Sequence, residues 1–261
     1  MHPLINIAIS AARNASKIIL RSVDRIDTLT ITEKNTNDFV TDADTQAEQE
    51  IIKTIHKAYP QHAILAEEGG AVGKNDYTWI IDPIDGTNNF IHGLPHFSIS
   101  IAVSYKNKIE HGLVYDPILQ ELFTASRGSG AFLNDRRIRV GNRKNFKGTL
   151  IGTGYGLKNP KNIATHLALL QKLLPEAAGI RRSGSAALDF AYVACGRYDG
   201  FWELGLAPWD VAAGGLLVKE AGGVVSDFSG NEDYLSTGNV IASNPKIHKL
   251  IFAAATAIKD E

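Results

Sequence analysis

The feature that most constrains the fold is a run of four closely spaced strand-like segments in the middle of the chain. They are rich in Ile, Val, Tyr, Phe and Trp, the residues that favour strands. Short turn signals such as Lys106-Asn107 separate them. Strands joined by short turns pair with their neighbours in the chain, so this stretch predicts an antiparallel meander. The four segments are residues 78–82, 97–105, 109–115 and 120–125.

Helical segments lie on both sides of the predicted meander. Residues 3–21 and 42–58 carry apolar residues at helical spacing, and Thr41 with Asp44 forms a capping-box pattern. Sheets covered by helices predict an α+β, or layered α/β, fold over residues 1–261 as one unit, with a soft sub-domain boundary near 145–150. In the second half we expect helices at 161–174, 185–195, 208–221 and 245–258, alternating with strands at 149–153, 197–203, 223–227 and 239–242.

Composition excludes several classes of protein. The 261 residues include 27 Lys plus Arg and 28 Asp plus Glu, so the net charge of −1 argues against strong autonomous binding to nucleic acid. A single cysteine, Cys195, allows no internal disulfide. No apolar run is long enough to span a membrane, and the first residues have no signal-peptide pattern. We therefore expect a cytoplasmic protein that makes no membrane contact.

The most informative segment is Asp82-Pro83-Ile84-Asp85-Gly86-Thr87, at the end of an apolar strand. We expect the strand to end at Asp82, because Pro83 has no N–H for the ladder. Asp82 and Asp85 can then converge on one cation, and a helix that opens at Gly86-Thr87 offers N–H groups to a phosphate. An isolated Asp-x-x-Asp is more often a turn and a cap, so the assignment needs further acidic residues.

Two other acidic positions supply that support. Glu67-Glu68 follows the apolar run 63–66, and Asp210 opens a predicted helix. Two bare carboxylates about 4 Å apart repel by ~4 kcal/mol at an effective dielectric of 20, so a shared cleft would require cations. Oxygen ligands without His or Cys select Mg²⁺, Mn²⁺ or Ca²⁺ over Zn²⁺, and a carboxylate that bridges two ions would form a two-metal clamp for phosphoryl transfer.

These segments, taken together and in order, resemble the signatures of the inositol monophosphatase family. The resemblance spans about residues 4 to 250 and is strongest to the bacterial SuhB-type branch. It implies a five-layered αβαβα sandwich of the inositol monophosphatase / fructose-1,6-bisphosphatase type. The matching segments are Asn37-Asp38-Phe39-Val40-Thr41 with Asp44, Ala66-Glu67-Glu68, Asp82–Thr87, Trp209–Gly214 and residues 220–223.

The resemblance implies a set of metal ligands. Glu67, Asp82 and the backbone carbonyl of Ile84 would hold a first Mg²⁺. Asp82, Asp85 and Asp210 would hold a second, and Glu67 would also contact a third, weaker ion. Two or three Mg²⁺ ions per subunit are therefore expected, with inhibition by lithium.

The resemblance also implies catalytic and substrate-binding residues. Thr87, hydrogen-bonded to Asp44, would activate a water molecule, with Glu67 as a further catalytic residue. From the sequence pattern alone, Asp44 has an alternative role, which is only to complete the helix cap at Thr41. The implied substrate contacts are Ile84, Asp85, the N–H groups of Gly86 and Thr87, Arg181, Ser185, Ala186, Glu203 and Asp210.

Two functions from different classes remain open. The first is hydrolysis of a phosphate monoester, foremost myo-inositol 1-phosphate, by a homodimer; fructose 1,6-bisphosphate, histidinol phosphate, NADP and 3′-phosphoadenosine 5′-phosphate are alternative substrates. The second, implied by the SuhB-type match, is regulatory binding within the ribosomal RNA antitermination complex, with NusA and RNA polymerase as partners. A local basic patch is either a solvated hairpin or a partner contact. It comprises Arg136, Arg137, Arg139, Arg143 and Lys144.

Three glycines at and just beyond the end of the strand expected at 149–153 resemble a phosphate-binding loop. Their spacing misses the dinucleotide-binding fingerprint, and no Lys-Ser or Lys-Thr follows as a Walker motif requires. We therefore expect a flexible strand exit at Gly152, Gly154 and Gly156.

Overall fold

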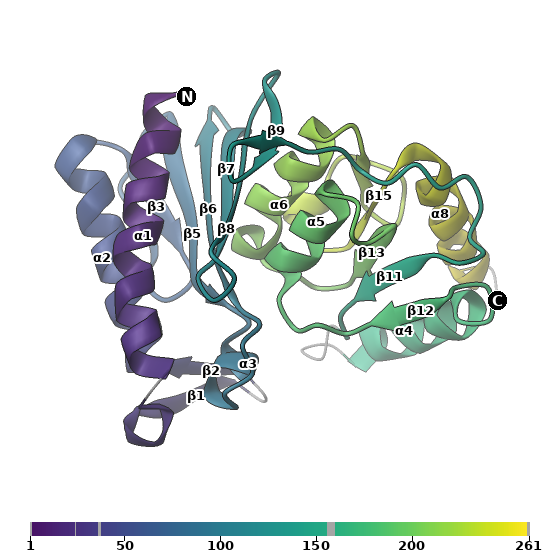
Figure 1. The fold of residues 1–261 in the computed structure, drawn as a ribbon, viewed down its shortest axis with the longest axis horizontal. Coiled ribbons are helices and arrows are strands. Elements are labelled where there is room, and N and C mark those ends of the chain that lie inside the picture. Colours follow the sequence, from purple (N-terminus) through teal and green to yellow (C-terminus); the bar gives the residue numbers. More distant parts are fainter. Residues whose placement is uncertain (1, 24, 36–37, 156–159, 260–261) are drawn as a thin grey trace.

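The computed structural model describes residues 2–23, 25–35, 38–155 and 160–259. Five layers follow one another across the molecule (Figure 1). Helices α1 and α2 cover one face of an eight-stranded sheet, and α5 and α6 fill the space between this sheet and a five-stranded sheet. Helices α4 and α8 cover the outer face of the smaller sheet. The expected αβαβα sandwich is confirmed.

The first half of the chain builds the outer helical layer and the larger sheet. Its strand order is β10-β9-β8-β7-β6-β5-β3-β4, and a separate hairpin of β1 and β2 lies beside α3 at one end (Figure 1). The elements are α1 (Pro3–Val23), η1 (Ile26–Thr28), β1 (Ile31–Asn35), β2 (Asp38–Thr41), α2 (Asp42–Ala58), β3 (Ala63–Ala66), β4 (Gly70–Val72), β5 (Tyr77–Asp85), α3 (Thr87–Ile91), β6 (Ser98–Tyr105), β7 (Lys108–Asp116), β8 (Glu121–Ser126), β9 (Gly130–Leu133) and β10 (Arg136–Arg137).

The second half builds the smaller sheet and the helices around it. Its strand order is β12-β11-β13-β15-β14, in which β11 runs parallel to β12 and β13 while β15 runs antiparallel to β13 and β14. The elements are β11 (Leu150–Thr153), α4 (Pro160–Leu173), β12 (Gly179–Arg181), α5 (Ala186–Ala194), β13 (Gly200–Glu203), α6 (Pro208–Glu220), β14 (Val224–Ser226), α7 (Tyr234–Thr237), β15 (Val240–Ser243) and α8 (Pro245–Lys259).

The predicted antiparallel meander is confirmed, since β5, β6, β7 and β8 pair in chain order. The sequence did not predict that β3 adds a parallel strand on the far side of β5. That pairing places the residues after β3 beside those at the end of β5, because parallel strands end at the same edge of a sheet. Glu67 therefore lies next to the Asp82 segment, and its N–H donates to the carbonyl of Ile81 at 3.1 Å.

The expectation that the strand ends at Asp82 was wrong. Strand β5 continues to Asp85, where pairing resumes opposite Ser98 after an irregularity in the register. Pro83 lies inside this bulge, where a missing N–H removes no ladder hydrogen bond. The bulge therefore lets one strand carry both carboxylates while re-aiming the second.

Glycines allow the middle helical layer to approach its neighbours closely. A Cβ on Gly112 of β7 would lie 2.9 Å from the carbonyl oxygen of Ala213, and one on Gly214 would lie 2.4 Å from the Cβ of Phe190. Both distances are far below van der Waals contact, so α6 packs against β7 and α5 through bare backbone. The position of α6, which carries Asp210, is fixed by this packing.

The chain crosses from the larger to the smaller sheet between Arg137 and Leu150, and the soft boundary near 145–150 stays a prediction. Asn37 and Gly156, which the sequence interpretation also named, lie outside the described residues. Over the part of the chain that is described, no helix has both the length and the apolar character needed to cross a membrane.

Candidate metal centre and active site

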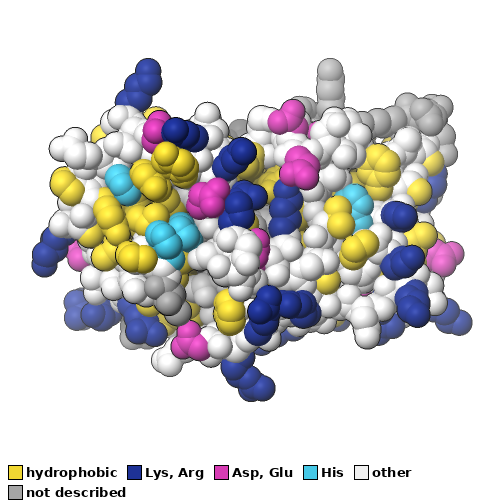
Figure 2. Space-filling view, turned by 90° about the horizontal axis from the view of Figure 1, so that it is seen from above, with side chains coloured by type: hydrophobic (Ala, Val, Ile, Leu, Met, Phe, Trp, Pro, Cys, Tyr) yellow, Lys and Arg dark blue, Asp and Glu magenta, His cyan; other side chains and the backbone are white. Residues whose placement is uncertain are grey.

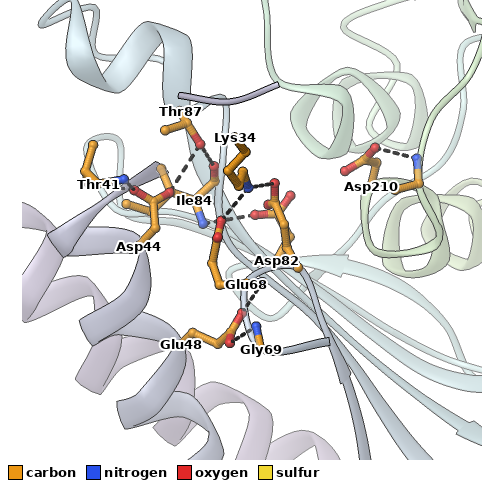
Figure 3. Close-up of polar contacts among 12 residues, drawn as sticks. Lys34, Thr41, Asp44, Glu48, Glu68, Gly69, Asp82, Ile84, Thr87 and Asp210 are labelled. Carbon is orange, nitrogen blue, oxygen red and sulfur yellow. Dashed lines mark hydrogen bonds and ion pairs between the residues drawn. The ribbon is translucent and has the colours of Figure 1, made fainter. Parts of the chain in front are cut away.

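Three carboxylates from the two halves of the molecule meet where β5 faces α6. Oxygen atoms of Asp82, Asp85 and Asp210 all lie within 4.8 Å of one another. Asp82 and Asp85 flank the bulge of β5. Asp210 lies in the first turn of α6 and faces Asp82 from the other side (Figure 3). Asp210 is held there because its Oδ2 accepts a hydrogen bond from the N–H of Ala207 at 2.7 Å.

Burial makes this arrangement electrostatically costly. Asp82 and Asp85 expose only 2% and 7% of their surface. Burial raises the pKa of Asp82 well above its ordinary value, and the charges of Glu67, Asp85 and Asp210 raise it further. Burial also raises the pKa of Asp85 to about 6, although the Ser185 hydroxyl and two N–H groups of α5 donate to it. Desolvation and mutual repulsion therefore both favour a cation bound at the cluster.

Glu67 extends the cluster, and Lys34 supplies a positive charge at its edge. The side chain of Glu67 interacts directly with that of Asp82. Lys34 Nζ lies 3.0 Å from a carboxylate oxygen of Glu67 and 2.8 Å from one of Glu68 (Figure 3). Burial lowers the pKa of Lys34, but its hydrogen bonds to Glu68 and Glu67 together with their negative charges outweigh that effect and raise the pKa above its ordinary value. Lys34 therefore stays charged and partly neutralises this edge of the cluster.

Hydrogen bonds from behind the cluster fix the loop that carries Glu67. The carboxylate of Glu48, on α2, accepts hydrogen bonds from the N–H groups of Glu68 at 2.8 Å and Gly69 at 2.7 Å. A Cβ on Gly69 would lie 2.8 Å from the same carboxylate, so a larger residue here would push the Glu48 side chain away from these N–H groups. These hydrogen bonds thus hold the loop that carries Glu67 and Glu68 against α2.

Thr87 and Asp44 form the predicted pair. Thr87 Oγ1 lies 3.2 Å from Asp44 Oδ1 and 2.9 Å from the carbonyl oxygen of Ile84, so its single proton serves one acceptor at a time (Figure 3). The other oxygen of Asp44 accepts from the N–H and hydroxyl of Thr41 at 2.8 and 2.6 Å. Asp44 therefore caps α2 with one oxygen and faces Thr87 with the other. Burial raises its pKa to about 6.

The residues present fit a divalent metal. Carboxylates from Glu67, Asp82, Asp85 and Asp210 converge, and oxygen is the donor that Mg²⁺ prefers. The carbonyl oxygen of Ile84 accepts a hydrogen bond from Thr87 Oγ1 at 2.9 Å, and the N–H of Ile84 donates to Asp82 Oδ1 at 3.0 Å. The donor set contains no His or Cys, which disfavours Zn²⁺.

A small cavity of about 120 Å³ opens beside Asp85 and Asp210. Ser185 and Ala186 line it, but their donors bind the Asp85 carboxylate: the hydroxyl of Ser185 at very short range and the N–H of Ala186 at 3.2 Å. Burial, with the charges of Asp210 and Asp85, raises the pKa of Glu203 to about 8. The other lining residues are Thr153, Gly154, Arg182, Gly184, Asp189 and Leu206.

Not every predicted site residue comes to this cavity. Arg181 ends β12, is exposed, and donates to the carbonyl of its neighbour Ile180 at 3.2 Å. Arg182, the next residue, lines the cavity instead.

Gly86 adopts a φ of 99° at the start of α3, and a Cβ there would lie 3.1 Å from the carbonyl oxygen of Gly184. Gly86 therefore joins the metal-side turn to the wall of the cavity.

The sequence interpretation missed Lys34, Arg182 and Asp189. Lys34 belongs to a short hairpin strand with no apolar signature, so no sequence signal linked it to Glu67. The glycines at 152 and 154 were the available signal for the cavity. A Cβ on Gly154 would lie 2.0 Å from the Glu203 carboxylate. The absence of a side chain at Gly154 therefore leaves space for Glu203, a role that differs from the flexible strand exit expected from the sequence.

Comparison with known proteins gives the family. A profile of the inositol monophosphatase family matches residues 1–260. The chain belongs to the inositol monophosphatase family. Membership in this family of phosphatases agrees with the layered fold and with an acidic cluster able to bind metal.

Relatives within the inositol monophosphatase family are similar over nearly their whole length. The Nus factor SuhB of Pseudomonas aeruginosa is 52% identical over 257 residues, covering 96% of this chain and 95% of the relative. The Nus factor SuhB of Escherichia coli K12 is 51% identical, with coverages of 97% and 96%. Among solved structures, the suppressor protein SuhB of Bartonella henselae has a TM-score of 0.94 at 42% identity, covering 97% and 98%. An IMPase of Thermotoga maritima has a TM-score of 0.90 at 37% identity, covering 99% of each chain.

The raised pKa of Glu203 predicts a pH-dependent effect on stability. Glu203 keeps its proton to about pH 8 when folded, but its ordinary value is 4.5, so the folded chain binds more protons between these limits. The free energy of unfolding of the wild type therefore falls as pH rises between these limits. Glu203→Gln has no carboxyl at this position, so its free energy of unfolding does not fall for this reason. In urea unfolding with EDTA, the stability gain of Glu203→Gln over wild type should grow from about pH 5 to about pH 8.

A matched control separates this effect from a general one. Glu232 is exposed, and the hydrogen bond from Lys219 lowers its pKa, so Glu232→Gln should show no growing gain over the same range. A pH-independent difference between Glu203→Gln and wild type would contradict the assignment of Glu203 as a carboxyl that is neutral when folded.

Proposed function

We propose that this chain is a Mg²⁺-dependent phosphatase of small polyol or sugar phosphate monoesters, foremost myo-inositol 1-phosphate. One observation carries the proposal: the buried carboxylates of Asp82 and Asp85 and the half-buried carboxylate of Asp210 come from two halves of the fold and lie within 4.8 Å of one another, beside the Thr87–Asp44 pair. Divalent cations stabilise such a cluster, and without them the carboxylates repel one another.

The metal ligands would divide into two overlapping sets. Glu67, Asp82 and the carbonyl of Ile84 would hold one Mg²⁺, and Asp82, Asp85 and Asp210 another, with Glu67 available to a third. When bound, Mg²⁺ lowers the pKa of water and stabilises negative charge on a leaving oxygen. Asp82, which interacts with Glu67 on one side and lies beside Asp85 and Asp210 on the other, would be the shared ligand.

The polar groups around the cluster would position and deprotonate water. The Thr87 hydroxyl reaches both Asp44 and the carbonyl of Ile84, so it can donate to either and accept from a water molecule. Asp44 would receive the proton that Thr87 passes on, because a hydroxyl is too weak a base by itself. Glu67 would assist by orienting water, and the N–H groups of Gly86 and Thr87 would bind the phosphate.

The substrate alcohol would occupy the cavity beside Asp85. Ser185, Ala186 and Glu203 line it, and the family resemblance adds Arg181 as a more distant contact. A volume of about 120 Å³ suits a compact hydroxylated group, since a water molecule takes roughly 30 Å³. The preference for inositol 1-phosphate over NADP or 3′-phosphoadenosine 5′-phosphate rests on the family resemblance. A homodimer and inhibition by lithium are part of the same proposal.

Removal of one metal ligand should abolish turnover and spare the fold. Asp210→Asn keeps the shape of the side chain but removes a charge, which relieves repulsion in the cluster. We expect phosphate release from myo-inositol 1-phosphate to fall at least ~1,000-fold with Mg²⁺ present, with an unchanged or higher unfolding midpoint in EDTA. Asp76→Asn, at an exposed position, is the matched control and should keep wild-type activity.

The same assay over a panel of monoesters, with and without Mg²⁺ and Li⁺, tests the substrate. Full activity of Asp210→Asn, or equal wild-type activity in EDTA and in Mg²⁺, would reject the metal assignment.

A second candidate function is favoured by the names of two relatives. Proteins called Nus factor SuhB are 51–52% identical to this chain over nearly its whole length. This chain would then bind NusA and RNA polymerase, and catalysis would be separable from binding. Part of the local basic patch is available for such contact: Arg136 and Arg137 are exposed and form β10, the outermost strand of the larger sheet, which we call the basic edge. Basic side chains are spread widely over the face of the molecule that Figure 2 shows, so charge alone does not single out this edge.

Pull-down with NusA distinguishes the two functions. The binding role predicts that Asp210→Asn, inactive as an enzyme, still captures NusA as well as wild type does. Arg136→Glu with Arg137→Glu would probe the basic edge in the same experiment. No capture of NusA by wild type would reject the second function and leave the phosphatase proposal intact.

A further inference from the structure

Two carboxyl groups interrupt the apolar face of helix α2. Asp44 and Glu48 lie one turn apart on the buried face of this helix, among alanine and isoleucine side chains, and expose 0% and 4% of their surface. Acidic side chains are seldom buried without polar partners, because the charged form loses its hydration. Asp44 has its partners in Thr41 and Thr87. The partners of Glu48 indicate what the second carboxyl does.

Both oxygens of Glu48 hold the turn that follows Glu67. Oε2 accepts a hydrogen bond from the N–H of Glu68 at 2.8 Å, and Oε1 accepts one from the N–H of Gly69 at 2.7 Å (Figure 3). Two consecutive N–H groups that each have their own oxygen match an ionised carboxylate, since a side-chain amide offers only one acceptor oxygen. Both contacts are with backbone groups beyond Glu67, so Glu48 acts on the chain behind the cluster.

Keeping a charged group at this position costs free energy. Burial raises the pKa of Glu48, the two N–H groups oppose this effect, and the charge of Glu67 raises the pKa further. A neutral amide would avoid the repulsion from Glu67 but could not satisfy both N–H groups. With the carboxylate, Glu67 lies between two anchors: its own N–H donates to the carbonyl of Ile81 at 3.1 Å, and the next two N–H groups bind Glu48.

We propose that Glu48 is a positioning residue that sets the affinity of the metal ion held by Glu67. This inference rests on the proposed function, in which Glu67 is a metal ligand, and Glu48 is not among the site residues predicted from the sequence. A carboxylate oxygen binds its ion only within about 2.0–2.6 Å, so a small shift of the turn after β3 removes Glu67 from the coordination sphere. Groups that orient metal ligands typically contribute roughly 10–100-fold to metal affinity.

Mn²⁺ binding to the full chain without substrate tests the inference, because electron paramagnetic resonance of free Mn²⁺ reports affinity in the absence of turnover. Glu48→Asp keeps the charge but shortens the side chain by one methylene, so it cannot reach both N–H groups. In the wild type, and in an Asp210→Asn background that disables the other ligand set, Glu48→Asp should weaken binding of the Glu67 ion roughly 10–100-fold. In a Glu67→Gln background it should cause no further loss, because the ligand that it positions is already gone.

Matched variants separate positioning from charge. Glu50 lies on the same helix, and its carboxylate binds Lys53 at 3.0 Å, so Glu50→Asp should bind Mn²⁺ as the wild type does. Glu48→Gln loses the charge and keeps one acceptor oxygen, and it should also lose affinity for the Glu67 ion. A purely electrostatic role would instead weaken Glu48→Gln and leave Glu48→Asp unchanged. If Glu48→Asp fails to fold by circular dichroism, Glu48→Gln replaces it in both backgrounds.

The outcomes separate the inference from the function on which it rests. Wild-type Mn²⁺ affinity in Glu48→Asp overturns the inference alone. An equal loss of affinity in the Asp210→Asn and Glu67→Gln backgrounds also overturns it, because the effect would not pass through Glu67. Absence of Mn²⁺ binding by the wild type overturns the proposed function, and the inference with it. A loss that disappears in the Glu67→Gln background supports both.

Discussion

Mutual repulsion among carboxylates that are buried or half-buried is the constraint on which the rest of the structure depends. Oxygen atoms of Asp82, Asp85 and Asp210 lie within 4.8 Å, and Glu67 contacts Asp82 from a neighbouring strand. Bringing these carboxylates together costs free energy, because each must be desolvated and held close to groups of like charge. The fold supplies the holding forces from outside the cluster: a bulge in β5, a cap at α6 and the N–H groups of α5 that bind Asp85.

The packing of helices α5 and α6 in the middle layer determines where Asp210 and the hydrogen-bond donors to Asp85 lie. Helix α6 brings Asp210 to the larger sheet, and it can do so because Gly112 lets its backbone approach β7. Helix α5 packs on α6 at Gly214, and its N-cap residue is Ser185, whose hydroxyl binds Asp85. A shift of either helix would therefore move a carboxylate or its hydrogen-bond donor. The same helices form one wall of the cavity where the substrate alcohol would bind, so metal binding and substrate selection share one scaffold.

The sequence predicted the parts of this arrangement that local pattern governs. Strand-forming runs with short turns indicated the meander, helical spacing indicated the covering helices, and acids at element ends indicated Asp82, Asp85 and Asp210. The failures concern features set by tertiary contacts. The strand was expected to end at Asp82, because a bulge cannot be distinguished from a break in the sequence. Arg182 lines the cavity without having been predicted, and the role of Arg181 stays a prediction. Lys34 and Asp189 acquire their surroundings only when distant elements meet.

The most direct test of the central claim is to locate divalent ions in the cluster. Crystals grown with Mn²⁺ in place of Mg²⁺ give an anomalous signal that marks each ion. We predict anomalous peaks within coordination distance, about 2.0–2.6 Å, of carboxylate oxygens of Asp82, with Glu67 or with Asp85 and Asp210 as further ligands. A well-ordered cluster with no anomalous peak at millimolar Mn²⁺, and Lys34 still bound to Glu67, would contradict the claim.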